Sequence, residues 1–342
     1  MTMIVIKKHL PVNVALALAL STSAVSFADS RGEPGRSSGK PNPLNNVYFG
    51  EQHLHTANSP DAFAMGTRNT PDDAYRFAKG EAIKKNTSGE MVQKKTPYDW
   101  AAVTDHAGYM GVMPQLSDPN SDLRKKGKDD PIVKMMLSGD PAQGQKAFAE
   151  LATGFVHNQP YPLFNDPQIT ANAWRRQVET TNKHYEPGKF TTLIAFEWTS
   201  IPVNQNLHRN VFFRDEKGPE AQFSAFDSDR PEDLWTYIQA QRDAGHQAFA
   251  IPHNSNLSNG LMFAPRDSEG QPINKAYAER RAKYEVAVEI IQTKGQSDTH
   301  PALSPNDEFA SFEQQYKHPV SYTHLTLPTT WSRCRSRWSP YH

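Results

Sequence analysis

Short apolar runs alternate with amphipathic stretches along the chain from about residue 46 to residue 319. The runs that predict β-strands lie at residues 47–50, 100–104, 191–196, 210–213, 248–251 and 286–291. Helical spacing is found at about residues 70–79, 170–184 and 232–242. Thr70 followed by Pro71 is a typical helix start, and Pro231 begins the last of these helices. Strands that alternate with helices predict an α/β domain.

One long segment, residues 111–166, interrupts this alternation. It is polar and rich in proline and glycine, with some helical spacing. We interpret it as an insertion in a single domain that spans residues 46–319, and we expect it to shape the substrate pocket.

The start of the chain has the pattern of an export signal. A basic start precedes a short apolar run at residues 12–20, and small residues allow cleavage after Ala28. The alternative is a membrane anchor, but the run is shorter than the ~20 apolar residues that span a bilayer. We therefore expect a signal peptide at residues 1–28, a flexible tether at residues 29–45, and a periplasmic or secreted protein with no stable membrane insertion after cleavage.

Composition narrows the classes of partner. Lys plus Arg and Asp plus Glu both number 37, so the formal net charge is zero and gives no support for nucleic-acid binding. The content of hydrophobic residues is only 37% and there are 26 prolines, which favours ordered loops around a core over a helix bundle. The single cysteine, Cys334, excludes an internal disulfide.

Residues 320–342 do not resemble the rest of the chain. Val320 to Thr329 resembles a translation of the transposase-end adapter used in sequencing libraries, and Cys334 to His342 resembles the outer part of this adapter in the same frame. The alternative is a genuine basic and aromatic tail. We interpret residues 320–342 as adapter-derived, so we expect the domain at residues 46–319 to be incomplete and the natural protein to continue beyond Pro319.

Polar side chains gather where the predicted strands end. They are His53, His55, His106, Glu197 and His253, with His208 just before a strand. The pair His53 and His55 places two imidazoles on the same side of an extended segment, because side chains alternate with period two. Imidazole and carboxylate together suit zinc, iron or manganese. Taken singly, each residue has a structural alternative, such as a buried histidine, an ion-paired glutamate or a loop cap.

The segments around these residues resemble the motifs of one superfamily. They are Tyr48 to Thr56, Val103 to His106, Ala195 to Trp198, Asn206 to Arg209, and Ile251 to Asn254. As an ordered set they are similar to the motifs of the polymerase and histidinol phosphatase (PHP) superfamily, and most of all to an exported branch, domain of unknown function 3604. The resemblance covers roughly residues 46–312.

This resemblance implies an α/β fold, a distorted (β/α)7 PHP-type barrel, that holds two or three divalent metal ions (Zn, Mn or Fe). It implies that His53 and His55 bind one metal and that Glu197 bridges to a second. The further ligands it implies are His106, His208 and His253, with Asp61 as an additional candidate. It also implies that Asp105 takes part by orienting a histidine or a water.

The chain differs from the superfamily at the closing Asp-x-His motif. Asp298 and His300 have its spacing, but they lie in a segment that resembles an internal part of the exported branch. We expect the true closing motif beyond Pro319, and Asp298 and His300 stay alternative ligands.

These residues predict hydrolysis of a small-molecule ester by a metal-activated water, with a phosphoester as the first choice. Arg209 is a candidate clamp for an anionic substrate, with a surface strand position as the alternative. Asn254 and Asn256 follow His253 and either bind substrate or shape the turn. The alternative functions are hydrolysis of carboxylic or carbamate esters within the same superfamily, and metal binding without catalysis.

Overall fold

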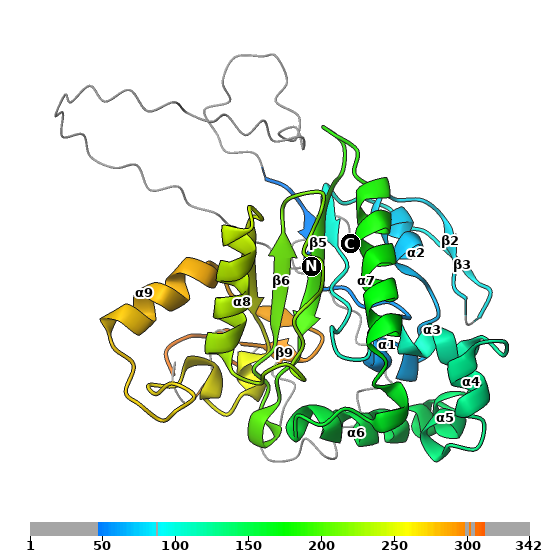
Figure 1. Ribbon diagram of the computed structural model, residues 1–342. Coiled ribbons are helices and arrows are strands. Elements are labelled where there is room, and N and C mark those ends of the chain that lie inside the picture. Colours follow the sequence, from blue (N-terminus) through cyan, green and yellow to red (C-terminus); the bar gives the residue numbers. More distant parts are fainter. Residues whose placement is uncertain (1–46, 87, 298–300, 302–304, 312–342) are drawn as a thin grey trace.

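The structure is a computed structural model that describes residues 47–86, 88–297, 301 and 305–311 (Figure 1). The segments interpreted as signal peptide, tether and adapter-derived tail lie outside these residues, and so do Asp298 and His300. Within the described ranges, no helix has the length and apolar character needed to cross a membrane.

A mixed five-stranded sheet lies at the centre of the fold, in the order β1-β4-β5-β6-β7. Its strands are β1 (Gly50–Glu51), β4 (Trp100–Ala102), β5 (Thr191–Trp198), β6 (Arg209–Phe213) and β7 (Ala248–Pro252). The first three run parallel, whereas β6 is antiparallel to both of its neighbours. The predicted α/β class is confirmed.

Within the part of the chain that the structure describes, this sheet is open, with β1 and β7 at its edges. The expected (β/α)7 barrel is therefore not found there. The antiparallel β6 is a further difference from a purely parallel barrel. It follows β5 after a connection that contains no α-helix. Such a connection favours antiparallel pairing, because parallel neighbours need a crossover of a dozen or more residues.

The remaining elements are short strands and helices. The strands form two hairpins, β2 (Ile83–Lys84) with β3 (Met91–Val92) and β8 (Ile291–Gln292) with β9 (Gly295–Gln296). The α-helices are α1 (Pro60–Ala64), α2 (Pro71–Ala78), α3 (Val112–Ser117), α4 (Asp122–Lys126), α5 (Pro131–Met136), α6 (Pro141–Val156), α7 (Pro167–Lys183), α8 (Pro231–Asp243) and α9 (Lys275–Tyr284). The 3₁₀ turns are η1 (Pro162–Phe164), η2 (Pro202–Asn204), η3 (Ser255–Leu257) and η4 (Leu261–Phe263).

The helix starts follow from local capping. α2 begins as predicted, with a capping box in which Thr70 and Asp73 exchange side chain–backbone hydrogen bonds. α8 also begins as predicted. α7 begins at Pro167, before the predicted Thr170, because the carboxylate of Asp166 accepts hydrogen bonds from the first free N–H groups of the helix. An aspartate followed by proline was the signal for this earlier start.

The strand predicted at residues 286–291 is wrong, because residues 286–290 belong to no strand. Their contact with β7 includes one hydrogen bond, from the N–H of Glu289 to a β7 carbonyl at 3.0 Å. The side chain of Glu289 is 2% exposed, whereas Val286 and Ile290 are 63% and 43% exposed. The alternation is real, but Glu289 and Ala287 face inward, whereas the larger apolar side chains point outward.

The two faces of the sheet differ in what covers them. α7 and α8 run alongside β5 and β6 (Figure 1) and bury one face under a large apolar core. Trp174 of α7 and Trp235 of α8 pack there with Phe196 of β5. The opposite face carries a smaller apolar cluster that includes Ala195 and Phe212. Polar side chains at the strand ends on this second face form the candidate site.

The insertion at residues 111–166 forms a helical module, seen as α3 to α6 in Figure 1, and it shares its apolar core with Phe63 and Ala64 of α1. It packs on α1 so closely that a Cβ on Gly144 would lie 2.6 Å from the Ala64 carbonyl oxygen. Phe155 of α6 lies 6.4 Å from His106 between ring centroids. The insertion is therefore more helical than its composition predicted, and it borders the candidate site.

Candidate metal centre

The seven side chains predicted as metal ligands lie together at one end of the sheet. His53 and His55 follow β1, Asp61 lies in α1, His106 follows β4, Glu197 lies in β5, His208 precedes β6 and His253 follows β7. Because β6 is antiparallel, its first residue lies at the same edge as the last residues of β5 and β7. The mixed sheet therefore still gathers these residues in one place.

Alternation along the strands puts these side chains on the same face. Glu197 of β5 pairs with Asn210 of β6, so His208, two residues before Asn210, lies on the Glu197 side. The N–H of His253 donates to the carbonyl of His208 at 3.2 Å, and the two rings have centroids 5.5 Å apart. Backbone pairing thus fixes the positions of three of the seven residues.

The carboxylate of Glu197 is the centre of the cluster and is buried. Its Oε2 lies 2.8 Å from His55 Nε2 and 3.3 Å from His53 Nε2. Its Oε1 lies 2.7 Å from His208 Nδ1 and 3.2 Å from His253 Nε2. His106 Nδ1 also lies 3.5 Å from Oε1, so one buried carboxylate faces five imidazoles.

Two groups of these residues could each hold a metal ion. They are His53 with Glu197 and His253, and His55 with Asp61 and His106, and the ligand atoms of each group lie within 4.8 Å of one another. The expectation that His53 and His55 bind the same metal differs from this grouping, which places them in different groups. Several buried atoms of the cluster make no hydrogen bond of suitable geometry among the described residues, although some of the imidazole nitrogens lie close to Glu197. These atoms are His55 Nε2, Glu197 Oε2, both ring nitrogens of His208, and His253 Nδ1. Buried polar atoms are rarely left unsatisfied, and coordination of a cation would satisfy these. The imidazole and carboxylate set fits zinc, manganese or iron.

The electrostatics favour the neutral imidazole that a metal ligand needs at His208 and His253. Nearby carboxylates, in contrast, raise the pKa of His53 and of His55. Burial lowers the pKa of His208 to about 3 and that of His253 to about 4, so both imidazoles are neutral near pH 7. Burial alone raises the pKa of Glu197, but the surrounding histidines outweigh it and hold this pKa well below its usual range. Burial lowers the pKa of His53, but the carboxylates of Glu289 and Glu197 outweigh it and raise the pKa to about 9. A cation bound at His53 therefore has to displace a proton.

Glu289 is a site residue that the sequence reasoning missed. Its Oε2 lies 2.9 Å from His53 Nδ1 and accepts a hydrogen bond from Gln52 Nε2 at 3.2 Å. With Nδ1 held in this way, His53 Nε2 is the nitrogen that faces Glu197. Carboxylates commonly fix the orientation of ligating histidines by this contact. The available signal was a single glutamate inside an alternating apolar run.

Thr199 is a second residue that was missed. Its Oγ1 lies 2.5 Å from His106 Nδ1, and His106 Nε2 lies 3.3 Å from Asp61 Oδ2. Thr199 follows Glu197 by two residues, so period-two alternation could have placed it on the same face. It orients His106 as Glu289 orients His53.

Asp105 lies behind the loop that carries His55 and belongs to neither group of candidate ligands. Its carboxylate accepts hydrogen bonds from Thr56 N at 2.6 Å and Thr56 Oγ1 at 2.7 Å. Burial raises the pKa of this carboxyl group. The structure thus gives Asp105 the role of fixing the backbone beside His55, and its expected role in orienting a histidine or a water stays a prediction.

Arg209 is corrected by the structure, because it faces away from the cluster. It pairs across the sheet with Trp198 on the helix-covered face and is 1% exposed. Its Nε lies 2.9 Å from Glu285 Oε1, and a terminal nitrogen donates to the Leu207 carbonyl. Arg209 is therefore neither a substrate clamp nor a surface residue but one half of a buried ion pair.

Asn254 and Asn256 differ in what they contact. Asn254 follows His253 and is buried, with neither side-chain atom hydrogen-bonded within the described ranges. Asn256 Nδ2 donates to the carbonyl of Lys294 at 2.9 Å, and Asn256 Oδ1 accepts from Ser297 Oγ at 2.9 Å. Only Asn254 is thus available to a ligand, whereas Asn256 ties the β8–β9 hairpin to the loop after β7.

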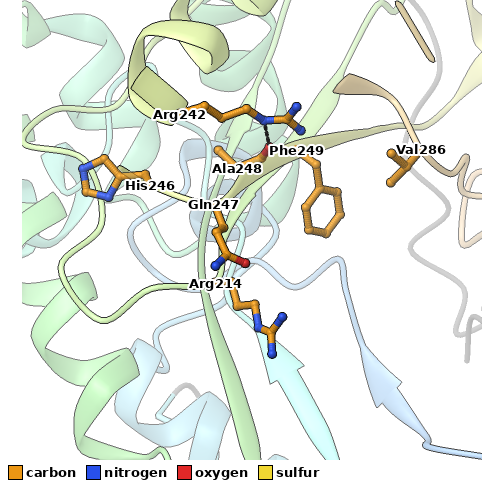
Figure 2. A pocket seen from close by; sticks show the side chains of 7 residues that line it. All are labelled: Arg214, Arg242, His246, Gln247, Ala248, Phe249 and Val286. Carbon is orange, nitrogen blue, oxygen red and sulfur yellow. Dashed lines mark hydrogen bonds between the residues drawn. The ribbon is translucent and has the colours of Figure 1, made fainter. Parts of the chain in front are cut away.

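A separate hollow of about 480 Å³ lies at the opposite end of β7 from His253 (Figure 2). Its lining includes Arg214, Arg242, His246 and Phe249. Arg242 Nε donates to the carbonyl of a β7 residue at 2.7 Å, which fixes one wall. None of the seven candidate ligands lines this hollow, so it is not part of the metal centre.

The fold and the site together describe an α/β protein with a candidate metal centre, made of buried imidazoles and carboxylates, at one end of its sheet. A family model described as Protein of unknown function (DUF3604) matches residues 42–335, so the chain belongs to this family. The expected relation to domain of unknown function 3604 is thereby confirmed. The matched range ends within the segment interpreted as adapter-derived. No curated protein and no solved structure was found to match the chain.

Proposed function

We propose that this protein is a metal-dependent hydrolase of the PHP type, whose sheet belongs to a distorted (β/α)7 barrel. The observation that carries the proposal is the surroundings of Glu197, where each carboxylate oxygen lies within 3.3 Å of two imidazole nitrogens. A carboxylate that only stabilises the fold needs no such set of imidazoles, several of them unsatisfied. A carboxylate that would help to hold two cations would be surrounded by such imidazoles, because they would supply the further ligands.

In this proposal the two groups of side chains hold two divalent cations, zinc, manganese or iron. His208, whose ring nitrogens are both unsatisfied in the described part of the chain, offers a further position, including one for a third cation. Cations held in this way supply Lewis acidity and an activated water for ester hydrolysis. Glu289 and Thr199 keep His53 and His106 oriented, and the helical insertion excludes water on the Phe155 side.

The proposed substrate is a small-molecule phosphoester, with carboxylic and carbamate esters as the alternative. The zero formal net charge gives no reason to propose a nucleic-acid substrate. A periplasmic or secreted location is part of the proposal and rests on the N-terminal pattern of residues 1–28.

Glu197→Gln tests the proposal, because glutamine keeps the shape of the side chain and removes its charge. We expect the wild-type protein to bind divalent metal and to hydrolyse aryl phosphate monoesters. Orienting partners of ligands alone contribute 10–100-fold to metal affinity, so Glu197→Gln should lose more than about 100-fold. Metal analysis and initial rates measure both effects. The matched control is Glu279→Gln in α9, which removes an exposed charge and should change neither quantity.

The possible outcomes separate the alternatives. If Glu197→Gln kept both metal and turnover, the site assignment would be wrong. Faster cleavage of aryl acetates than of phosphate monoesters or diesters would favour the carboxylic ester alternative. Tight metal binding by the wild type without turnover of any of these esters would favour a metal-binding protein that is not an enzyme.

A further inference from the structure

The β8–β9 hairpin is held against the candidate metal centre from two sides. Gln292 Nε2 donates to Glu289 Oε1 at 2.8 Å, and the other oxygen of Glu289 contacts a candidate ligand. On the other side, Asn256 Nδ2 donates to the carbonyl of Lys294 at 2.9 Å. The turn that carries Lys294 is therefore fixed beside the loop that follows His253.

Lys294 brings a positive charge to this site, and the described residues place no carboxylate against it. Its charge lowers the pKa of His208, in addition to the larger effect of burial. Among the residues that the structure describes, no carboxylate oxygen lies within 4.0 Å of its ammonium group. The side chain is half-buried. Since a partly buried charge without a counter-charge is costly, an anionic ligand would stabilise Lys294.

Asn254 provides an independent observation in the loop that contacts Lys294 through Asn256. Its side chain is 1% exposed, yet neither its amide nitrogen nor its amide oxygen has a partner in the described part of the chain. Its φ of 59° lies in the left-handed region, directly after His253. An unsatisfied buried amide is costly, and a hydrogen bond to a ligand would offset this cost.

We propose that Lys294 and Asn254 form an anion-binding subsite beside the metal centre that holds the non-bridging oxygens of a phosphate monoester. The Lys294 ammonium supplies the charge, and the Asn254 amide N–H donates a hydrogen bond. The subsite takes the role that the sequence assigned to Arg209, whose guanidinium faces the opposite side of the sheet. Asn256 becomes a positioning residue for the hairpin. This inference rests on the proposed function and narrows its substrate class.

Lys294→Gln tests the subsite, because it removes the charge and keeps most of the side-chain length. In the metal-loaded protein we expect about tenfold weaker binding of inorganic phosphate, measured by calorimetry, because a hydrogen bond to a charged group is lost. The KM for an aryl phosphate monoester should rise by a similar factor. Metal content and the rate with an aryl acetate should not change. Lys294→Arg should restore most of the phosphate affinity.

Two further variants sharpen the test. Asn254→Gly removes the amide while accepting the positive φ, so it should weaken phosphate binding without straining the backbone. Asn254→Asp keeps the shape and adds a negative charge, so it should weaken phosphate binding more than Asn254→Gly. Lys275→Gln is the matched control, because the side chain of Lys275 is 88% exposed, and it should change nothing.

The results distinguish this inference from the proposed function. If the loaded wild type hydrolyses phosphate monoesters while Lys294→Gln behaves like Lys275→Gln, the subsite is overturned and the function stands. If the loaded wild type binds phosphate through Lys294 but hydrolyses no ester, the function fails and the subsite stands. A loaded wild type that binds no phosphate overturns the subsite, as does an equal loss of activity on phosphates and acetates in Lys294→Gln.

Discussion

Two buried groups of polar and charged side chains lie on opposite faces of the sheet. Each contains one of two residues that are neighbours in the sequence, His208 and Arg209. His208 belongs to the candidate metal centre, and Arg209 belongs to an ion pair on the helix-covered face. In that pair, Glu285 Oε1 accepts from Arg209 Nε and Trp235 Nε1, each at 2.9 Å. Glu285 Oε2 accepts from Arg281 Nε at 2.8 Å. This carboxylate is fully satisfied by the protein.

The carboxylate at the candidate metal centre, in contrast, is not fully hydrogen-bonded. Glu197 Oε2 lies 2.8 Å from His55 Nε2, yet the two atoms have no hydrogen bond among the described residues. A buried network that serves stability is satisfied by its own members, because an unsatisfied buried group is costly. Both oxygens of Glu285 accept hydrogen bonds, and Arg281 Nη2 is the one atom of this group without a hydrogen-bond partner among the described residues. The larger number of unsatisfied atoms around Glu197 therefore indicates binding, and the satisfied carboxylate of Glu285 indicates a structural role.

The largest expected effect on stability is at the ion pair. Glu285→Gln leaves Arg209 buried without a counter-charge, so the free energy of unfolding should fall by about 3–5 kcal/mol. Metal binding at the other face should be retained. Urea unfolding of the metal-free protein and metal analysis measure the two effects.

Glu279→Gln is the control here as well, since an exposed substitution of this kind changes stability by roughly 0.5 kcal/mol or less. If Glu285→Gln were as stable as this control, or if it lost its metal, the division between a structural and a binding cluster would be wrong.

The same comparison shows what the sequence could predict. The candidate ligands could be placed because they follow predicted strands, and because His53 and His55 obey the period of two. The same rule, applied to His208 and Arg209, also implies that consecutive strand residues point to opposite faces. Arg209 could thus have been excluded from the site once His208 was accepted as a ligand.

Other features were out of reach of the sequence. Alternation at residues 286–291 gives two faces but does not say which one points inward. Burial of Glu289 is decided by His53, a contact between residues 236 positions apart in the chain. The short connection between β5 and β6 could have predicted that β6 is antiparallel, but the expectation of a parallel barrel took precedence.

A smaller effect is expected at Glu289, which contacts a candidate ligand without being one. Glu289→Gln removes the charged partner of His53 Nδ1, and loss of such a partner costs about 10–100-fold in metal affinity. The variant should therefore still bind metal, but less tightly than the wild type and more tightly than Glu197→Gln. Competition with a chelator of known affinity measures all three proteins. An affinity equal to that of the wild type would show that Glu289 does not orient His53.

The smallest expected effect is the pH dependence of the ion pair. Burial alone raises the pKa of Glu285, but the charges of Arg209 and Arg281 outweigh it and lower the pKa below its usual 4.5. A carboxyl group with a lowered folded-state pKa contributes stability that is complete above its unfolded-state pKa. This contribution is lost as the pH falls through the folded-state pKa.

The difference in unfolding free energy between wild type and Glu285→Gln should therefore be constant from about pH 8 to about pH 5.5 and should shrink below about pH 4.5. Urea unfolding of both metal-free proteins at a series of pH values measures this difference, and acidic groups elsewhere in the chain affect both proteins alike. A difference that grew on acidification would mean that Glu285 is not the ionised partner of Arg209. The assignment of Glu285 to the stability of the fold and of Glu197 to binding would then be wrong.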